Sequence, residues 1–267
     1  MRNASELDEL FAFANVLADA ARAAILPHFR AGILAENKAA IGFDPVTIAD
    51  EAAEAAMRAL IQARYPDHSI HGEEYADQIG TSPWQWVLDP IDGTRAFIAG
   101  LPTWGVLIGL TYLGTPCIGI LDQPFTGERF RGRPEGSDWV RFDERIILKT
   151  RDQPLLTQAT LTTTDPIIFT PAEKGAFDQV RATARLTRLG LDCYGYGMVA
   201  MGNIDLVVEA GLKAVDIVAC IPIIEGAGGC VVDWRGNPTA HQGGQALAVG
   251  DRRLIDQALV ALRRSAT

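Results

Sequence analysis

The hydrophobic period of this chain changes from helical to strand-like near Trp84, and this change limits the fold more than any other feature. Residues 5–31 place apolar side chains at helical spacing, and Ser5 can cap the start of that helix. A second helix should follow Thr47 and end before Pro66. From Trp84 to Tyr112 the chain instead contains β-rich runs separated by Pro, Gly and Asp. The chain therefore combines helices and strands in one mixed α/β structure.

The same mixture continues to the C-terminus. Strand-like runs cover residues 86–88, 104–110, 116–121, 159–163, 205–209 and 229–232, and helical patterns cover 172–184, 217–226 and 253–262. Residues 126–145 are the most polar and least periodic, and we expect exposed connections around a hairpin there. Since no repeat or clear linker is present, we expect a single domain over 1–267. The amino-acid composition changes gradually near residue 150, and this change could divide the domain into two lobes, 1–150 and 151–267.

Composition excludes several classes of partner. The formal net charge is −9 and there is no long Lys/Arg run, so neither nucleic acid nor an anionic membrane is an expected partner. No apolar run reaches the length of a membrane span, and the first residues lack the apolar region of a signal peptide. The four cysteines are scattered singly and the four histidines show no metal-ligand spacing. We therefore expect a cytoplasmic protein with reduced, buried thiols.

Acidic residues cluster where strands or helices end. The four clusters lie at 44–50, 70–74, 86–94 and 215–217. In the third cluster, Val87 and Leu88 are typical of a buried strand, so Asp89 should lie at the end of that strand. Pro90 follows it and has no backbone N–H to donate to a neighbouring strand. Asp92 returns three residues later, so a turn can aim both carboxylates at one point. The backbone carbonyl of Ile91 lies between them.

This cluster has the chemistry of a magnesium site. Hard oxygen ligands without His or Cys are those that Mg²⁺ prefers. Phosphoryl transfer to water needs charge neutralisation and an in-line nucleophile, which clustered carboxylates holding two metals can supply. Gly93 and Thr94 would then present backbone N–H groups to an anion. Considered alone, Glu73 and Glu74 could be a solvated surface pair, and Asp216 could be the cap of a helix. Considered together, the clusters predict a metal-dependent phosphatase.

The motifs that carry these residues resemble the inositol monophosphatase superfamily of Mg²⁺-dependent phosphatases. The matching segments are Asp-Pro-Val-Thr-x-Ala-Asp at 44–50, Gly-Glu-Glu at 72–74, Asp-Pro-Ile-Asp-Gly-Thr-x-x-Phe at 89–97, and Asp216 followed by 222–229. They run in family order over nearly the whole chain. The resemblance implies a layered αβαβα sandwich.

The resemblance also implies roles for individual residues. The implied metal ligands are Glu73, Asp89, the Ile91 carbonyl, Asp92 and Asp216, for two or three Mg²⁺ ions, with Mn²⁺ able to substitute. The implied catalytic residues are Asp50, Glu73, Glu74 and Thr94, with Asp50 hydrogen-bonded to Thr94 and the carboxylates helping to orient the attacking water. Asp92, Gly93 and Thr94 are implied to bind the substrate at its phosphate.

Within the superfamily, several sequence segments are most similar to those of the histidinol-phosphatase branch, whose members act in histidine biosynthesis. The similar segments are 94–105, 192–196 and 205–213, whereas Ala214-Val215 departs from the Pro-Tyr of that branch and from the Trp of inositol-specific members. Histidinol phosphate carries an amine and an imidazole, which an acidic rim suits. We therefore expect Asp192 and Glu209 to bind the substrate, with Arg188 near the phosphate.

Two other functions remain open at this point. One is hydrolysis of an inositol, sugar or nucleotide phosphate, which would use the same metal chemistry with another alcohol. The other is a non-catalytic regulator that binds a phosphorylated metabolite, although retention of Asp50, Glu73 and Thr94 argues against lost catalysis. A homodimer is implied by the family resemblance only.

Overall fold

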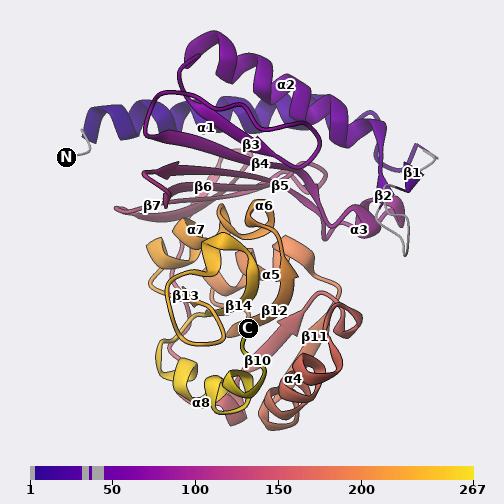
Figure 1. Ribbon diagram of the computed structural model, residues 1–267, viewed down its shortest axis with the longest axis vertical. Coiled ribbons are helices and arrows are strands. Elements are labelled where there is room, and N and C mark those ends of the chain that lie inside the picture. The colour runs from indigo at the N-terminus through magenta and orange to yellow at the C-terminus, as the bar shows by residue number, and fades with distance from the viewer. Residues whose placement is uncertain (1–3, 32–35, 38–44) are drawn as a thin grey trace.

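Five layers of helices and sheets make up the computed structural model, which describes residues 4–31, 36–37 and 45–267 (Figure 1). The helices are α1 (Ala4–Ile25), α2 (Ile48–Arg64), α3 (Thr94–Ile98), α4 (Pro171–Thr183), α5 (Asp192–Ala200), α6 (Ala214–Ile217), α7 (Cys220–Gly226) and α8 (Arg253–Leu262). The strands are β1 (Glu36–Asn37), β2 (Pro45–Val46), β3 (Ser69–Gly72), β4 (Trp84–Asp92), β5 (Gly105–Tyr112), β6 (Thr115–Gln123), β7 (Glu128–Arg133), β8 (Gly136–Arg141), β9 (Glu144–Ile147), β10 (Thr160–Thr163), β11 (Leu186–Leu189), β12 (Leu206–Leu212), β13 (Cys230–Val232) and β14 (Gly244–Val249). Of the described helices, none has both the length and the apolarity needed to cross a membrane.

Two sheets form the second and fourth layers. The first has seven strands in the order β3-β4-β5-β6-β7-β8-β9, antiparallel except for the parallel pair β3 and β4. The second has five strands in the order β11-β10-β12-β14-β13, with β10 parallel to both of its neighbours. Helices α1 and α2 cover the outer face of the first sheet, α5, α6 and α7 lie between the sheets, and α4 and α8 cover the far face of the second (Figure 1). The αβαβα arrangement implied by the resemblance is therefore confirmed.

Each interface between layers has its own apolar core. One cluster joins α1 and α2 to the first sheet and contains Trp86 and Leu88. A second joins the two sheets through α5 and α7, and a third lies between the second sheet and α4 and α8. Because side chains alternate along a strand, Val87 faces the other way from Trp86 and Leu88 and packs against Val215 and Val218. The departure at Val215 is thus accommodated by a small apolar contact with β4.

A row of glycines brings the central helices close to the first sheet. Gly109, Gly119 and Gly132 lie opposite one another on β5, β6 and β7. A Cβ atom on Gly119 would lie 1.9 Å from the Ala219 carbonyl oxygen, and one on Gly132 would lie 2.3 Å from the Ile223 Cα. No other residue fits such approaches. These glycines therefore set how closely the helical segment that contains α6 packs onto the sheet.

Several sequence predictions need correction. The first helix begins at Ala4, so Ser5 lies inside it, and the helix expected over 217–226 is divided into α6 and α7. Residues 126–145 contain the expected hairpin, formed by β7 and β8, but they are mostly strand and Phe130 is fully buried, so the prediction of exposed connections there was wrong. Asp44 lies outside the described residues. The division into two lobes at residue 150 stays a prediction, and strands of the first sheet come from 69–147 and those of the second from 160–249.

Candidate active site

The central helices face the side of β4 that carries Asp89. Val87 packs against α6, and Asp89, two residues further along the strand, lies on the same face. Leu88 points into the core under α1 and α2. Asp89 is therefore turned into the space between the two sheets, and only 1% of the residue is exposed.

Asp92 reaches the same space through an irregularity in β4. Regular pairing with β5 holds up to Asp89 and resumes at Asp92, so Pro90 and Ile91 lie in a bulge. The sequence predicted a turn after the strand, whereas the structure keeps Asp92 as the last strand residue. The consequence for the carboxylates is the one expected, because a bulge re-aims a side chain that would otherwise follow the strand's alternation.

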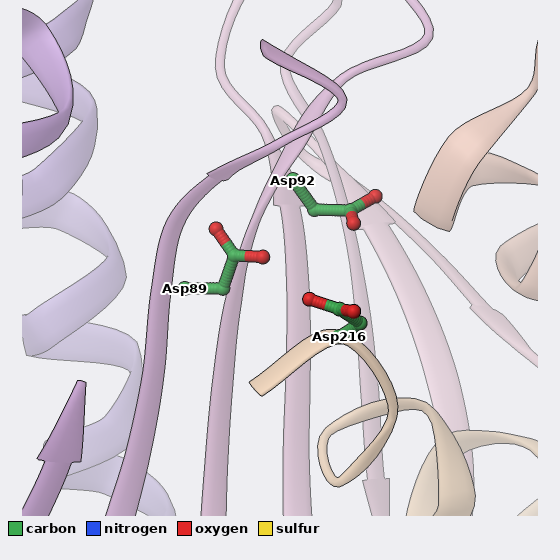
Figure 2. A group of neighbouring side chains, drawn as sticks. All are labelled: Asp89, Asp92 and Asp216. Atoms are coloured by element: carbon green, nitrogen blue, oxygen red, sulfur yellow. The ribbon is translucent and has the colours of Figure 1, made fainter. Parts of the chain in front are cut away.

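Asp216 on α6 completes a cluster of three carboxylates. One oxygen from each of Asp89, Asp92 and Asp216 lies within 4.8 Å of the others, and Figure 2 shows the three groups turned toward a common space. Backbone N–H groups hold two of them, since Cys193 donates to Asp92 Oδ2 at 2.6 Å and Lys213 donates to Asp216 Oδ2 at 2.7 Å. The helix-capping role considered for Asp216 is therefore compatible with membership of the cluster.

The cluster has the properties of a cation site. Burial raises the pKa of Asp89 well above its usual value, and the nearby carboxylates Glu73, Asp92 and Asp216 raise it further. Burial also raises the pKa of Asp92, together with repulsion from Asp192 and Asp216. Asp89 Oδ1 is buried and accepts no hydrogen bond from any described residue. A buried acceptor of this kind is costly unless something binds it, and an all-oxygen donor set suits a hard divalent cation.

A cavity of about 290 Å³ opens over the cluster. Its described lining contains one basic side chain, Lys213, and six carboxylates: Glu73, Asp89, Asp92, Asp192, Glu209 and Asp216. The backbone around Ile91 and Gly93, together with Thr94 and Thr164, also lines it. A phosphate could enter such a cavity only if bound cations offset the negative charge.

Glu73 is placed by a buried acid that sequence reasoning missed. Glu54 on α2 is fully buried, is paired with Arg58 at 2.7 Å, and accepts the backbone N–H of Glu74 at 2.7 Å. A Cβ atom on Gly72 would lie 2.0 Å from Glu54 Oε1. The Glu54–Arg58 pair therefore fixes the turn that carries Glu73. Its signal in the sequence was an acid and a base four residues apart on the apolar face of a helix.

Gly93 occupies a position that only glycine fits. Its φ is +83°, and an added Cβ would lie 3.0 Å from the Asp192 side chain. The close approach brings the first turn of α3 beside the start of α5. The Thr94 hydroxyl donates to the Ile91 carbonyl oxygen at 3.1 Å, which ties that turn back to the bulge of β4.

Asp192, which is half-buried, and Glu209, which is buried, line the same cavity. Burial raises the pKa of Asp192 to about 6, against the opposing influence of Arg95. Burial raises the pKa of Glu209 to about 8, although its carboxylate accepts the Thr164 N–H at 2.6 Å. Acids buried at this cost beside a cavity are candidates for ligand binding rather than for surface ion pairs.

The remaining predicted residues lie around the cavity or away from it. Asp50 is buried and accepts the Thr47 N–H and hydroxyl at 2.8 and 2.6 Å, so its pairing with Thr94 stays a prediction. Neither Asp50 nor Glu74 belongs to the lining of the cavity. Arg188 is exposed on β11, and its side chain is also absent from that lining. Thr164 and Lys213 line the cavity, and the sequence singled out neither as a site residue.

Comparison with known proteins agrees with this geometry. Residues 6–267 match the inositol monophosphatase family. A chloroplastic bifunctional phosphatase of Arabidopsis thaliana is 39% identical over 97% of this chain and 76% of its own length, and a histidinol-phosphatase of Streptomyces coelicolor is 34% identical over 95% and 96%. The solved structure of an inositol monophosphatase from Zymomonas mobilis superposes with a TM-score of 0.86 at 42% identity, covering 98% of this chain and all of that one. This chain therefore belongs to the inositol monophosphatase family, and it is a phosphatase.

Proposed function

We propose that this phosphatase hydrolyses histidinol phosphate in the presence of Mg²⁺, releasing histidinol and inorganic phosphate. The observation that carries this proposal is the position of Asp192, which is half-buried, and Glu209, which is buried, in the cavity that also contains the carboxylate cluster. An alcohol that bears an ammonium group and an imidazole can form ion pairs with such acids, whereas a neutral polyol can only donate uncharged hydrogen bonds to them.

The residues fit a site for two or three divalent cations. Glu73, Asp89, Asp92, Asp216 and the Ile91 carbonyl would hold them. Bound cations of this kind lower the pKa of water and offset charge on the phosphate. Asp89 Oδ1 is buried and has no hydrogen-bond partner among the described residues, which supports this assignment. Because no described His or Cys belongs to the cluster, Mg²⁺ is the favoured ion.

The chain's own groups would bind and orient the reactants. Gly93 and Thr94 lie at the start of helix α3, where backbone N–H groups have no acceptor inside the helix. These two N–H groups can therefore donate to phosphate oxygens. Glu73 and Thr94, which line the cavity, would orient the attacking water, with Asp50 and Glu74 acting from outside that lining, and one of these carboxylates would take up the water proton. Water adds its oxygen to phosphorus, the ester P–O bond breaks, and the alcohol oxygen leaves with a proton.

Charge selects the alcohol in this account. The Asp192 carboxylate would supply this charge to the ammonium or imidazole of the substrate, and Gly93 places Asp192 directly beside the phosphate-binding turn. Glu209, which holds its proton near neutral pH in the metal-free protein, would face the same groups as a hydrogen-bond partner. We leave Arg188 out of the binding site because its side chain is exposed and does not line the cavity. The name of the Streptomyces coelicolor relative supports the same substrate.

Inositol phosphate is the second candidate, because the similar structure from Zymomonas mobilis is titled an inositol monophosphatase. A phosphate-release assay with histidinol phosphate, inositol 1-phosphate and adenosine 3′,5′-bisphosphate distinguishes the two candidates. We expect kcat/KM to be highest for histidinol phosphate. A preference for either other compound would exclude the histidinol assignment and leave only the phosphatase.

A cytoplasmic homodimer that takes part in histidine biosynthesis completes the proposal. The four cysteines are buried thiols, which supports a reducing compartment. The dimer rests on the family resemblance, and light scattering of the purified protein measures it directly.

A further inference from the structure

Lys213 forms an ion pair across the mouth of the cavity. Its Nζ lies 2.7 Å from Glu73 Oε1, and the two residues come from segments 140 positions apart in the chain. Lys213 is also the one basic side chain among the described residues that line the cavity. The pair therefore places the only positive charge of this lining on one of the proposed metal ligands.

The two partners differ in how easily they can separate. The Lys213 side chain is 58% exposed and can move into water, whereas the Glu73 side chain is only 20% exposed. Exposed ion pairs add little stability, so breaking this one has a small cost. The Lys213 backbone would stay in place, because its N–H donates to Asp216 Oδ2.

A divalent cation and the ammonium compete for the same carboxylate. Asp89, at the base of the cavity, has an oxygen without a hydrogen-bond partner among the described residues, and a cation can bind it at once. Glu73 has no such freedom, because its Oε1 already accepts the ammonium. A cation that binds both acids must first displace Lys213.

We infer that Lys213 is an exchangeable counter-ion of Glu73, which neutralises this ligand in the metal-free protein and is displaced by the incoming metal ion. The inference rests on the proposed metal site, though not on the identity of the substrate. Its consequence is that Lys213 raises the metal concentration that the protein needs.

Metal binding to the chelator-stripped protein tests this exchange without any substrate. Mn²⁺ is titrated into each variant, and free Mn²⁺ is followed by electron paramagnetic resonance. In Lys213→Met the competitor is lost, and we expect roughly threefold to tenfold tighter binding. Lys174→Met is the matched control, because the Lys174 side chain is about as exposed as that of Lys213 and pairs with Asp178 on α4 at 2.6 Å, outside the cavity. We expect its Mn²⁺ affinity to equal that of the wild type.

Lys213→Arg separates exchange from general charge repulsion. A guanidinium keeps the charge and can hold a carboxylate with two hydrogen bonds, so exchange predicts weaker Mn²⁺ binding than in the wild type. Repulsion alone predicts wild-type affinity for this variant, and that result would overturn the inference. So would unchanged affinity in Lys213→Met. If the wild type bound no Mn²⁺ at all, the metal site itself and the proposed mechanism would fall with it, whereas a wrong substrate assignment would leave these titrations unaffected.

Discussion

Glu209→Gln should stabilise the metal-free protein at alkaline pH. Only 2% of Glu209 is exposed, and burial raises the pKa of its carboxyl from 4.5 to about 8. Gln keeps the size of the side chain and an oxygen that can accept the Thr164 N–H. The variant therefore removes the ionisable group while preserving the contact that orients it.

The magnitude follows from proton linkage. Between pH 5 and pH 8 the unfolded chain has released the Glu209 proton and the folded protein still holds it, so the free energy of unfolding of the wild type falls as pH rises. Three pH units at about 1.4 kcal/mol each set an upper limit of about 4 kcal/mol. Glu209→Gln has no carboxyl to ionise here, so its free energy of unfolding does not fall for this reason. The difference in free energy of unfolding between the variant and the wild type should therefore grow from pH 5 to pH 8. For a protein of this size the shift in Tm should reach several degrees, on the order of 8 °C at most.

Thermal unfolding in EDTA at several pH values between 5 and 8 measures this difference. Glu144→Gln, which removes the same charge from the exposed strand β9, is the control and should show no such growth. A difference in Tm between Glu209→Gln and the wild type that stays constant with pH would refute the reasoning. It would mean that Glu209 ionises in the folded protein much as it does in the unfolded chain.

Three further predictions concern catalysis. Exhaustive chelation should abolish phosphate release and Mg²⁺ should restore it, whereas undiminished turnover in EDTA would exclude the metal mechanism. Asp89→Asn should lower kcat by at least about 100-fold with little loss of Tm, because it removes the charge at the base of the cluster; near-normal turnover would make the assignment of Asp89 wrong. Thr94→Ala and Asp50→Asn should each lower kcat while leaving Mn²⁺ binding largely intact, and the double variant should lose less than the product of the single losses; fully multiplicative losses would show that the two residues act independently.

Sequence reasoning worked best where local pattern and burial agree. The helices α1 and α2 follow from apolar spacing, and the Asp89 to Thr94 segment follows from a strand that runs directly into acids and a proline. The meeting of Asp89 with Asp216 depends on how α6 packs onto β4, and no local pattern contains that information. Only the family resemblance placed these two residues in one site.

Buried ion pairs explain the main failures. Residues 126–145 looked exposed because they are rich in charge, yet Arg129 is buried in an ion pair with Asp122 on the neighbouring strand. Glu54 was overlooked for the same reason, because an acid and a base four residues apart, such as Glu54 and Arg58, also occur on solvated helix faces. Charge in a sequence shows that a side chain needs a partner, but not whether that partner is water or another residue.

The central claim is that an acid of the cavity selects a cationic alcohol, and Asp192→Asn tests it most directly. Asp192 has a φ of +46°, a conformation that Asn tolerates as well as Asp, so the variant removes charge with little strain. The measurement is kcat/KM for histidinol phosphate relative to that for p-nitrophenyl phosphate, in both proteins at pH 7.5, where a group of pKa about 6 is ionised. We predict that the ratio falls by about 5- to 150-fold, equivalent to about 1–3 kcal/mol for a lost charged hydrogen bond. An equal loss of kcat/KM for the two substrates would contradict the claim. It would show that Asp192 supports the site as a whole and does not recognise the alcohol part of the substrate.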